Sequence, residues 1–335
     1  MRRGHTRSHS ELGSQALQRR WYFALRYGRV GRCQALIMKK NIIIVTGGAG
    51  FVGSNLIEKL LIETKCKIIS LDNYSSGFKS NHIQNKRVQY ILGDNKNFTQ
   101  FFKKINKQIK VIFHFGEFSR IVQSFEKMNQ VYDSNFLGTY EVIRFCLENK
   151  IKIIYSATSA AFGNNFYDQH LSPYSFAKTK NLDLILNFHK WYNLQYEIVY
   201  FYNVYGPRHI KNHNMAAVIG IFEYCAEKNL PLPIVKPGTQ KRNFTHVSDT
   251  VSACVYAMKK NQNKQYSISC KKSYSIKEVA KLFKCQHKLL PSRSGERFKS
   301  IKMQSVHGQK ITYLYGKIDL KDYVKKFIKH KIKIN

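Results

Sequence analysis

Apolar runs alternate with amphipathic stretches along the first two thirds of the chain. The runs are rich in β-branched residues and cover 41–45, 66–71, 87–92, 110–115, 151–155 and 196–202. Between them, apolar residues recur at helical spacing in 98–105, in 132–148 and in a segment that extends to about Tyr192. Buried parallel strands are almost continuously apolar, whereas the helices that cover them have one apolar face. The pattern therefore predicts an α/β fold with a doubly wound parallel sheet of the Rossmann type.

The first apolar run leads into a glycine-rich turn and then into an amphipathic helix. The turn and the start of the helix contain Gly47, Gly50, Phe51, Val52 and Gly53. Glycines at this spacing allow a tight turn, close approach of the backbone to a pyrophosphate, and close packing of helix on strand. The free N–H groups at the start of the helix then hold the phosphates. The segment is typical of a dinucleotide-binding site.

The second apolar run ends in Asp72, at about the spacing expected of a carboxylate that binds the adenosine ribose. An acidic residue at this point disfavours the additional phosphate of NADP. The sequence therefore predicts NAD as the cofactor. The alternative is a glycine-rich structural turn followed by a surface aspartate.

Tyr174 and Lys178 are four residues apart in a predicted helix, and Thr158 lies upstream at the end of a predicted strand. Side chains four apart share one face of a helix. A free tyrosine titrates near pH 10, and a neighbouring cation favours its phenolate form. The set is typical of a site that removes a proton from a hydroxyl while a nicotinamide takes the hydride. Taken alone, the Tyr–Lys pair could equally be a solvated helix face.

Further polar and aromatic residues follow the predicted strands directly. At these strand ends lie Asp72, Asp94, Phe115, Thr158 and Asn203. Ligands of open α/β sheets bind outside the carboxyl ends of the strands. We therefore expect the active site at this edge of the sheet.

Beyond Asn203 the alternation becomes irregular. Prolines interrupt it at Pro207, Pro231, Pro233, Pro237 and Pro291. We expect residues 38–204 to form mainly the NAD-binding Rossmann domain. Residues 205–335 are expected to form mainly a smaller C-terminal substrate-binding lobe, with chain crossings back to the sheet.

The segment 1–37 differs in composition from the rest of the chain. It contains eight arginines but neither lysine nor asparagine, whereas lysine, asparagine and isoleucine dominate from Met38 onward. Met38 also opens almost directly onto the first strand. We interpret residues 1–37 as an upstream or appended segment outside the fold; an arginine-rich targeting peptide is the competing interpretation.

The formal net charge of +36 raises the question of an anionic partner. The lysines are spread along the sequence, and no nucleic-acid-binding module is recognisable among them. We therefore expect a solvated lysine-rich surface and no nucleic-acid partner. No apolar stretch is long enough to span a membrane. The seven scattered cysteines show no metal-ligand spacing, and a chain of this kind is typical of the cytoplasm.

Together these motifs resemble the extended short-chain dehydrogenase/reductase family, in particular NAD-dependent nucleotide-sugar epimerases of the UDP-glucose 4-epimerase type. The resemblance runs from about residue 40 to about residue 300. It implies epimerisation, at C4, of a UDP-hexose or UDP-N-acetylhexosamine through a transient 4-keto intermediate. In this interpretation Tyr174 is the base, Thr158 bonds the same sugar oxygen, and Lys178 supports the tyrosine and holds the nicotinamide ribose.

The resemblance also assigns cofactor and substrate contacts. Besides the glycine turn, the implied NAD-binding residues are Asp72, Asn73, Asp94, Asn95, Phe115, Gly116, Asn135, Tyr174 and Lys178. Asn135 matches an asparagine that commonly steadies the helix bearing the catalytic tyrosine. On the substrate side, Asn203, Arg242 and Arg293 match contacts to the sugar diphosphate, and a planar guanidinium pairs well with phosphate oxygens. Members of the family are often homodimers, which here implies contact through the helices 132–148 and 174–192.

Departures from the family pattern narrow the reaction and leave other points open. Ser159 and Ala160 follow Thr158 where dehydrating members have Asp-Glu, and some decarboxylating members have a Glu there. This argues against a 4,6-dehydratase and favours epimerisation. Glu117 and Arg120 are unusual, and they either reach the substrate or form a local ion pair. A nucleotide-sugar reductase or dehydrogenase and a non-catalytic NAD-binding protein remain the alternative functions.

Overall fold

The central sheet has nine strands in the computed structural model of the protein, which describes residues 40–162, 169–212, 214–295, 304–306 and 308–334. From one edge to the other, the order is β14 (Ser305–Val306), β15 (Gln309–Tyr315), β11 (Gln265–Ser269), β6 (Tyr196–Phe201), β5 (Lys152–Thr158), β4 (Ile109–His114), β1 (Ile42–Thr46), β2 (Lys67–Asp72) and β3 (Val88–Leu92). All neighbours pair in parallel except β14 and β15, which are antiparallel. The run from β3 to β6 has the strand order of a Rossmann fold, as predicted.

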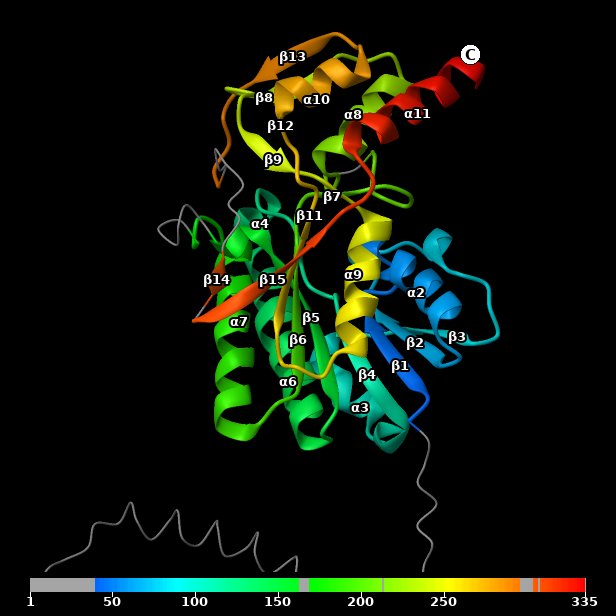
Figure 1. Ribbon diagram of the computed structural model, residues 1–335, viewed down its shortest axis with the longest axis vertical. Coiled ribbons are helices and arrows are strands. Elements are labelled where there is room, and N and C mark those ends of the chain that lie inside the picture. Colours follow the sequence, from blue (N-terminus) through cyan, green and yellow to red (C-terminus); the bar gives the residue numbers. More distant parts are fainter. Residues whose placement is uncertain (1–39, 163–168, 213, 296–303, 307, 335) are drawn as a thin grey trace, which may run out of the picture. The chain divides into compact units, whose positions relative to one another are not determined.

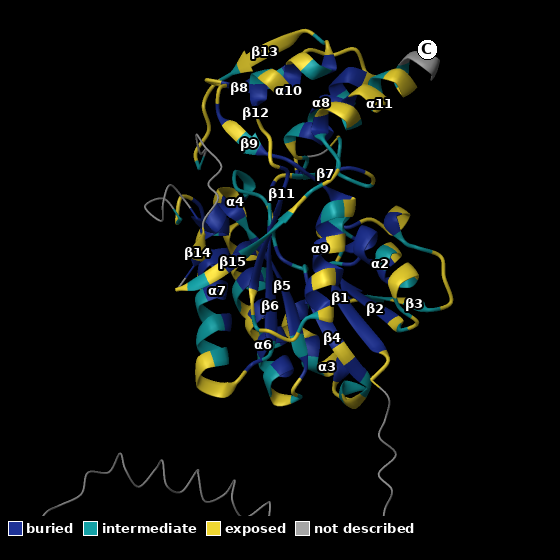
Figure 2. Ribbon diagram, in the orientation of Figure 1, coloured by how far each residue is buried: buried dark blue, intermediate teal, exposed yellow. Residues whose placement is uncertain are grey.

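Alternate residues of each strand enter opposite layers of the core. Ile42 and Ile44 pack in the cluster that contains residues of α3 (Phe98–Phe102), α6 (Thr139–Glu148) and α7 (Pro173–Tyr192). Ile43 and Val45 pack in the cluster on the other face, against α2 (Phe51–Glu63) and α9 (Val247–Lys259). Both faces of the sheet are therefore covered at its centre, which explains why β1 is almost continuously apolar. Figure 2 shows the central strands, among them β1, β4, β5 and β6, as mainly buried and the outward sides of the helices as exposed.

A second, smaller group of elements lies beyond the carboxyl ends of the strands (Figure 1). It is formed by α8 (Val218–Glu227), β8 (Leu232–Val235), β9 (Lys241–Asn243), β12 (Ser273–Ser275), α10 (Ile276–Phe283), β13 (His287–Leu290) and α11 (Leu320–Ile334). Its own apolar cluster contains Phe222, Ile234, Val279 and Val324. Two short strands, β7 (Val204–Tyr205) and β10 (Thr245–His246), pair with each other. Because β11 and β15 return to the sheet, the chain crosses between these elements and the sheet more than once.

Some boundaries differ from those expected from the sequence. The helix expected over 98–105 ends at Phe102. The helix expected over 132–148 begins as a π-helix over Tyr132–Gly138 before α6, preceded by the short helices α4 (Gln123–Glu126) and α5 (Met128–Val131). The interpretation of residues 1–37 concerns a segment outside the described residues. Within the described part, no helix combines the length and apolar character that crossing a membrane requires.

Candidate active site

A cavity of about 740 Å³ lies at the carboxyl ends of β1, β2, β4 and β5. One side is lined by the glycine turn and the strand ends, and the other by residues of the 203–222 segment and of the smaller group of elements. The cavity is within the size range of small-molecule and cofactor sites. It lies at the point where the strand order reverses, between β1 and β4, as is general for open α/β sheets.

The glycine turn forms a cradle in which side chains have no space. Gly47 has a φ of +71°, and a Cβ atom there would lie 2.9 Å from the backbone of Gly116. A Cβ atom on Gly53 would lie 2.1 Å from the carbonyl oxygen of Gly47. The backbone is thus bare at the start of α2, where N–H groups and the helix dipole favour a pyrophosphate. These residues fit the phosphates of NAD.

Asp72, at the end of β2, holds the turn in place. Its Oδ2 accepts a hydrogen bond of 2.9 Å from the N–H of Ala49, and its Oδ1 accepts one of 2.8 Å from the N–H of Tyr74. Burial raises the pKa of Asp72, while these backbone bonds and His82 act in the opposite direction. The carboxylate is therefore placed beside the glycine turn, where the ribose of a dinucleotide would lie.

The end of β3 continues this side of the cavity. Asn73 Nδ2 donates a hydrogen bond of 3.1 Å to Asp94, whose other oxygen accepts from the N–H of Lys96 at 2.9 Å. Asn95 Nδ2 donates to the carbonyl of Gly116 at 2.6 Å, which links the ends of β3 and β4. These side chains line the part of the cavity expected to receive the adenosine half of the cofactor.

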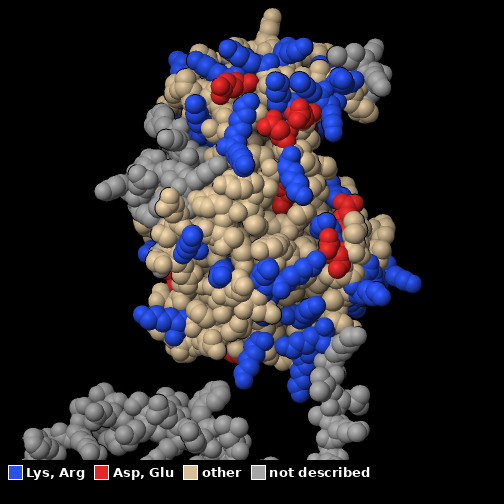
Figure 3. All heavy atoms as spheres, viewed as in Figure 1, with Lys and Arg blue, Asp and Glu red and all other residues tan. Residues whose placement is uncertain are grey.

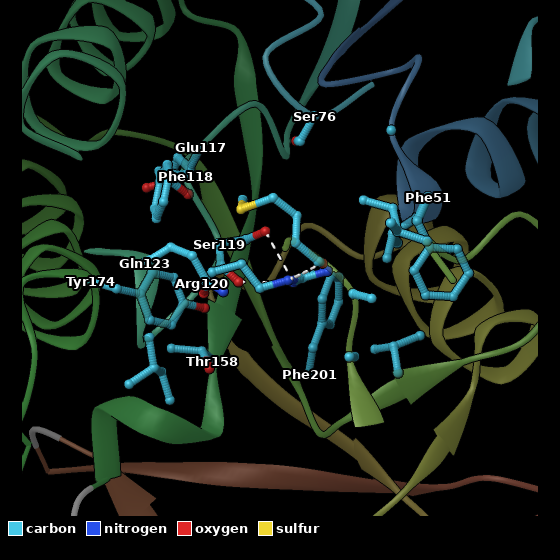
Figure 4. Close-up of a pocket in the computed structure, with 18 of the residues that line it drawn as sticks. Phe51, Ser76, Glu117, Phe118, Ser119, Arg120, Gln123, Thr158, Tyr174 and Phe201 are labelled. Atoms are coloured by element: carbon cyan, nitrogen blue, oxygen red, sulfur yellow. Dashed lines mark hydrogen bonds between the residues drawn. The ribbon is translucent and has the colours of Figure 1, made fainter. Parts of the chain in front are cut away.

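Thr158 and Tyr174 meet across the other end of the cavity (Figure 4). Thr158 ends β5, and its hydroxyl oxygen accepts a bond of 3.1 Å from the N–H of Ala160. Tyr174 lies in the first turn of α7, which begins with a capping box between Ser172 and Ser175 and with Pro173 at its first position. These signals fix the start of the helix and so the position of the phenol. Tyr174 is only 8% exposed.

Lys178, one turn along α7, is buried in an ion pair with Glu117. Its side chain is 5% exposed and that of Glu117 is 1% exposed. Lys178 Nζ donates to Glu117 Oε2 and also to the carbonyl of Ser156 at 2.6 Å. Glu117 Oε1 accepts hydrogen bonds from Tyr155 and Asn181, each at 3.0 Å. Both charges are therefore compensated inside the protein.

A chain of hydrogen bonds connects Glu117 to the glycine turn through His114. The Thr46 hydroxyl oxygen accepts from the N–H groups of Phe115 and Gly116, so its own proton faces His114 Nδ1 at 2.8 Å. His114 Nε2 bonds Thr139 at 2.9 Å, and the Thr139 hydroxyl donates to Glu117 Oε1 at 3.2 Å. Burial lowers the pKa of His114 to about 4, so the ring is neutral. The hydrogen bonds from Thr46 to Glu117 therefore all donate in the same direction. His114 is a buried structural residue.

Arg120 does not pair with Glu117, so the local ion pair considered from the sequence is wrong. Arg120 Nε donates to the carbonyl of Met215, and Nη1 donates to the carbonyl of Ser119 at 2.9 Å. Gln123 makes a similar bond to the carbonyl of Asn214. The segment after β4 is thereby bonded directly to the 214–215 segment. Figure 4 shows Arg120 between Tyr174 and Phe51.

The structure brings together nearly all the residues that the sequence nominated. The residues that line the cavity are Gly47, Gly50, Phe51, Val52, Gly53, Asp72, Asn73, Asp94, Asn95, Phe115, Gly116, Thr158, Tyr174, Lys178, Asn203, Arg242 and Arg293. Asn135 is not among the lining residues. It is fully buried, its side chain bonds the backbone N–H and carbonyl of Phe118, and its carbonyl accepts from Asn181 of α7. Asn135 thus supports the loop and the helix around the site.

Sequence reasoning missed some of the cavity wall. Phe201, at the end of β6, lines the cavity, and its position at a strand end was a usable signal. Met215, Ala216 and Ala217 also line it, from an irregular segment that carries no motif. Within the described residues, no cluster of His, Cys, Asp and Glu is arranged to hold a metal ion. On the face shown in Figure 3, Lys and Arg are scattered rather than gathered in one patch.

The fold is of the Rossmann type, and Thr158, Tyr174 and Lys178 line the same cavity as the glycine turn and Asp72. Residues 43–269 match the NAD dependent epimerase/dehydratase family. The chain belongs to this family, and NAD is its cofactor. When bound, NAD supplies a hydride acceptor and donor, and the protein supplies position and proton transfer.

Individual relatives give the same picture. The chain is 32% identical over 256 residues to a protein of Methanocaldococcus jannaschii provisionally named UDP-glucose 4-epimerase, covering 72% of this chain and 81% of that protein. It is 31% identical to UDP-N-acetyl-alpha-D-glucosaminuronate decarboxylase of Bacillus cytotoxicus, covering 72% and 79%. The crystal structure of Thermotoga maritima UDP-glucose 4-epimerase with UDP-glucose matches with a TM-score of 0.76 at 25% identity, covering 88% and 99%.

Proposed function

We propose that the protein is a nucleotide-sugar 4-epimerase that acts on a UDP-hexose or a UDP-hexose derivative with tightly held NAD. The observation that carries the proposal is the placement of Thr158 and Tyr174 together at the end of the cavity opposite the glycine turn and Asp72. The names of the relatives, which include a UDP-glucose 4-epimerase, support UDP as the nucleotide.

In the proposed reaction, Tyr174 removes the proton from the sugar C4 hydroxyl while the hydride leaves that carbon. Thr158 bonds the same oxygen and stabilises the charge that develops on it. The buried Lys178 keeps a positive charge one helical turn from the phenol. The 4-keto sugar then turns over and receives the hydride on its other face. Tyr174 returns the proton, so sugar and cofactor end with no net redox change.

The residues beside Thr158 favour epimerisation over elimination of water or loss of a carboxylate. Ser159 and Ala160 occupy the turn after Thr158, so no carboxyl group is available there as a general acid or base. Glu117, an acid that lines the same cavity, is held by Lys178, Tyr155 and Asn181. The relatives include decarboxylases, and this point separates the proposal from that activity.

For the diphosphate, we assign Arg242 and Arg293, with Asn203 beside them. Arg242 lies on β9 and Arg293 follows β13, so both reach the cavity from the smaller group of elements. Asn203 is held by a bond of 2.9 Å from its Nδ2 to the carbonyl of Asn243. Residues 38–204 would then bind mainly NAD, and residues 205–335 mainly the substrate.

We also propose a homodimer and a cytoplasmic location. Large apolar side chains are exposed on the π-helix, on α6 and on α7: Tyr132, Leu137, Tyr140, Phe176, Trp191 and Tyr192. Their exposure supports a helical contact between two copies, since apolar patches of this kind mark interfaces. Light scattering should give twice the chain mass, and a monomer at working concentration would contradict the dimer. The described cysteines are all free, which supports a reducing compartment.

The test of the proposed activity is an assay without added cofactor. Purified protein is incubated with a panel of UDP-hexoses, and the products are identified by chromatography and NMR. We expect a C4-inverted product with constant total sugar. Conversion only after external NAD(H) or NADP(H) is supplied, with stoichiometric redox change, would show a reductase or dehydrogenase instead. Release of water from these sugars, or of carbon dioxide from a UDP-hexuronate added to the panel, would likewise contradict the proposal.

A further inference from the structure

Arg120 is a cation inside the cavity whose protein partners are uncharged. It comes from the segment that follows β4, and it is only partly exposed. Its bonds go to the carbonyls of Met215 and Ser119 and to the Ser119 hydroxyl. Among the described residues, no carboxylate forms an ion pair with it. Burial lowers the pKa of Arg120, and the nearby Tyr174 acts in the opposite direction, so the two side chains are electrostatic neighbours.

The acidic residues that line the cavity are engaged elsewhere. Asp72 bonds the glycine turn, Asp94 bonds Asn73 and Lys96, and Asp133 pairs with Lys96. Glu117 is the closest in sequence, but it is used by Lys178 and three neutral donors. A guanidinium withdrawn from water without a counter-charge is unfavourable, and an incoming anion would relieve that cost.

The bonds of Arg120 fix where that anion would lie. Nε is fastened to the 214–215 segment and Nη1 to the chain's own loop, which holds the guanidinium between Tyr174 and Phe51 (Figure 4). Tyr174 and Thr158 are the groups that contact the C4 oxygen in the proposed reaction. C6 is bonded to C5, which is a ring neighbour of C4. The carboxylate carbon of a hexuronate is C6 itself, so it lies two bonds from the reacting carbon.

We propose that Arg120 binds a carboxylate on C6 of the sugar, so that the substrate class is a nucleotide-linked hexuronate. The inference rests on the proposed function and specifies its substrate. The diphosphate is the other anion of the same molecule. It is assigned to Arg242 and Arg293, which come from the smaller group of elements, whereas Arg120 comes from the segment after β4 and lies near Tyr174 (Figure 4).

The first test compares UDP-glucuronate with UDP-glucose, because the two differ only in the C6 group. We expect the wild-type protein to epimerise the uronate with a kcat/KM about tenfold to a hundredfold higher, as a charge-assisted bond to a buried group predicts. Arg120→Gln should bring that ratio close to one, and Arg120→Lys should retain part of it. Lys127→Gln, which removes an exposed charge from the same segment, is the matched control and should keep the wild-type ratio.

The second test measures binding, so that it stays informative when turnover is absent. In the Tyr174→Phe holoenzyme, calorimetry should give tighter binding of UDP-glucuronate than of UDP-glucose, and adding Arg120→Gln should remove the difference. Equal binding of the two sugars, or equal loss of both in Arg120→Gln, would overturn the assignment. If Arg120→Gln weakens UDP alone by as much as UDP-glucuronate, the anion is the diphosphate and the uronate proposal is wrong.

The two proposals fail in different ways. Inversion of neutral UDP-hexoses but not of uronates leaves the epimerase proposal intact and refutes the role of Arg120. A uronate preference in binding without C4 inversion of any sugar supports the role of Arg120 and refutes the epimerase.

Discussion

Two cations of the site, Lys178 and Arg120, have opposite environments. Lys178 is almost fully buried, and its charge is matched by Glu117 and by the carbonyl of Ser156. Arg120 is a partly buried residue of the cavity wall, and its partners are neutral carbonyl and hydroxyl oxygens. Lys178 therefore has a counter-charge within the protein, whereas no described carboxylate forms an ion pair with Arg120. We infer from this difference that Lys178 supports the reaction, whereas Arg120 selects the substrate.

The largest expected effect on activity comes from removing the hydroxyl of Tyr174. Tyr174→Phe deletes the base and leaves the surrounding charges in place, so kcat should fall by about 10⁴-fold, the upper range for a general base. NAD content, measured from the absorbance of the denatured protein, should remain at the wild-type level. Substantial turnover by this variant would show that another group removes the proton.

The ion pair between Lys178 and Glu117 can be disrupted by removing one of its charges. Glu117→Gln leaves the buried Lys178 without a counter-charge and should lower the free energy of unfolding by about 3–5 kcal/mol. The double variant Glu117→Gln/Lys178→Met removes both charges and should recover most of that stability, without recovering activity. Urea denaturation followed by circular dichroism gives all values.

The effect of Arg120→Gln on stability should differ from that of Glu117→Gln. Because no described carboxylate forms an ion pair with Arg120, this change should alter the free energy of unfolding by less than about 1 kcal/mol, as for other residues outside ion-pair networks. If Arg120→Gln and Glu117→Gln destabilise the protein equally, the distinction between the paired Lys178 and Arg120, which is bonded only to neutral oxygens among the described residues, is wrong.

The smallest expected effect concerns the pH dependence of stability, to which the neutral His114 contributes. Burial lowers the pKa of His114 from its ordinary 6.5 to about 4, so between these values the unfolded chain binds a proton that the folded protein does not. Stability is therefore lost as the pH falls from about 6.5 towards 4, and this group should contribute about 2 kcal/mol of loss between pH 7.5 and pH 5. His114→Gln should remove that part of the pH dependence in denaturation experiments. The exposed His287→Gln is the control, and identical pH profiles for His114→Gln and wild type would contradict the account.

Local sequence signals predicted much of the fold and of the site. The glycine turn, Asp72, Thr158 and Tyr174 lie where predicted, because each belongs to a strand end or a helix start that short-range pattern defines. The capping residues before α7 are of the same kind.

The partners of these residues could not be predicted in the same way. Lys178 and Glu117 are 61 positions apart, and Arg120 and Met215 are 95 apart. Such contacts depend on how loops from distant parts of the chain meet, and no spacing rule encodes that. Asn135 shows the same limit, since its supporting bonds to Phe118 and to α7 arise from the packing of three segments.

The central claim is that the hydride removed from C4 returns to the same carbon within one active site. It is tested most directly with a UDP-hexuronate and a UDP-hexose labelled with deuterium at C4, incubated in ordinary water without added cofactor and followed by NMR. The account predicts a C4-inverted product that retains the deuterium at C4. An inverted product in which solvent hydrogen has replaced the label would contradict it.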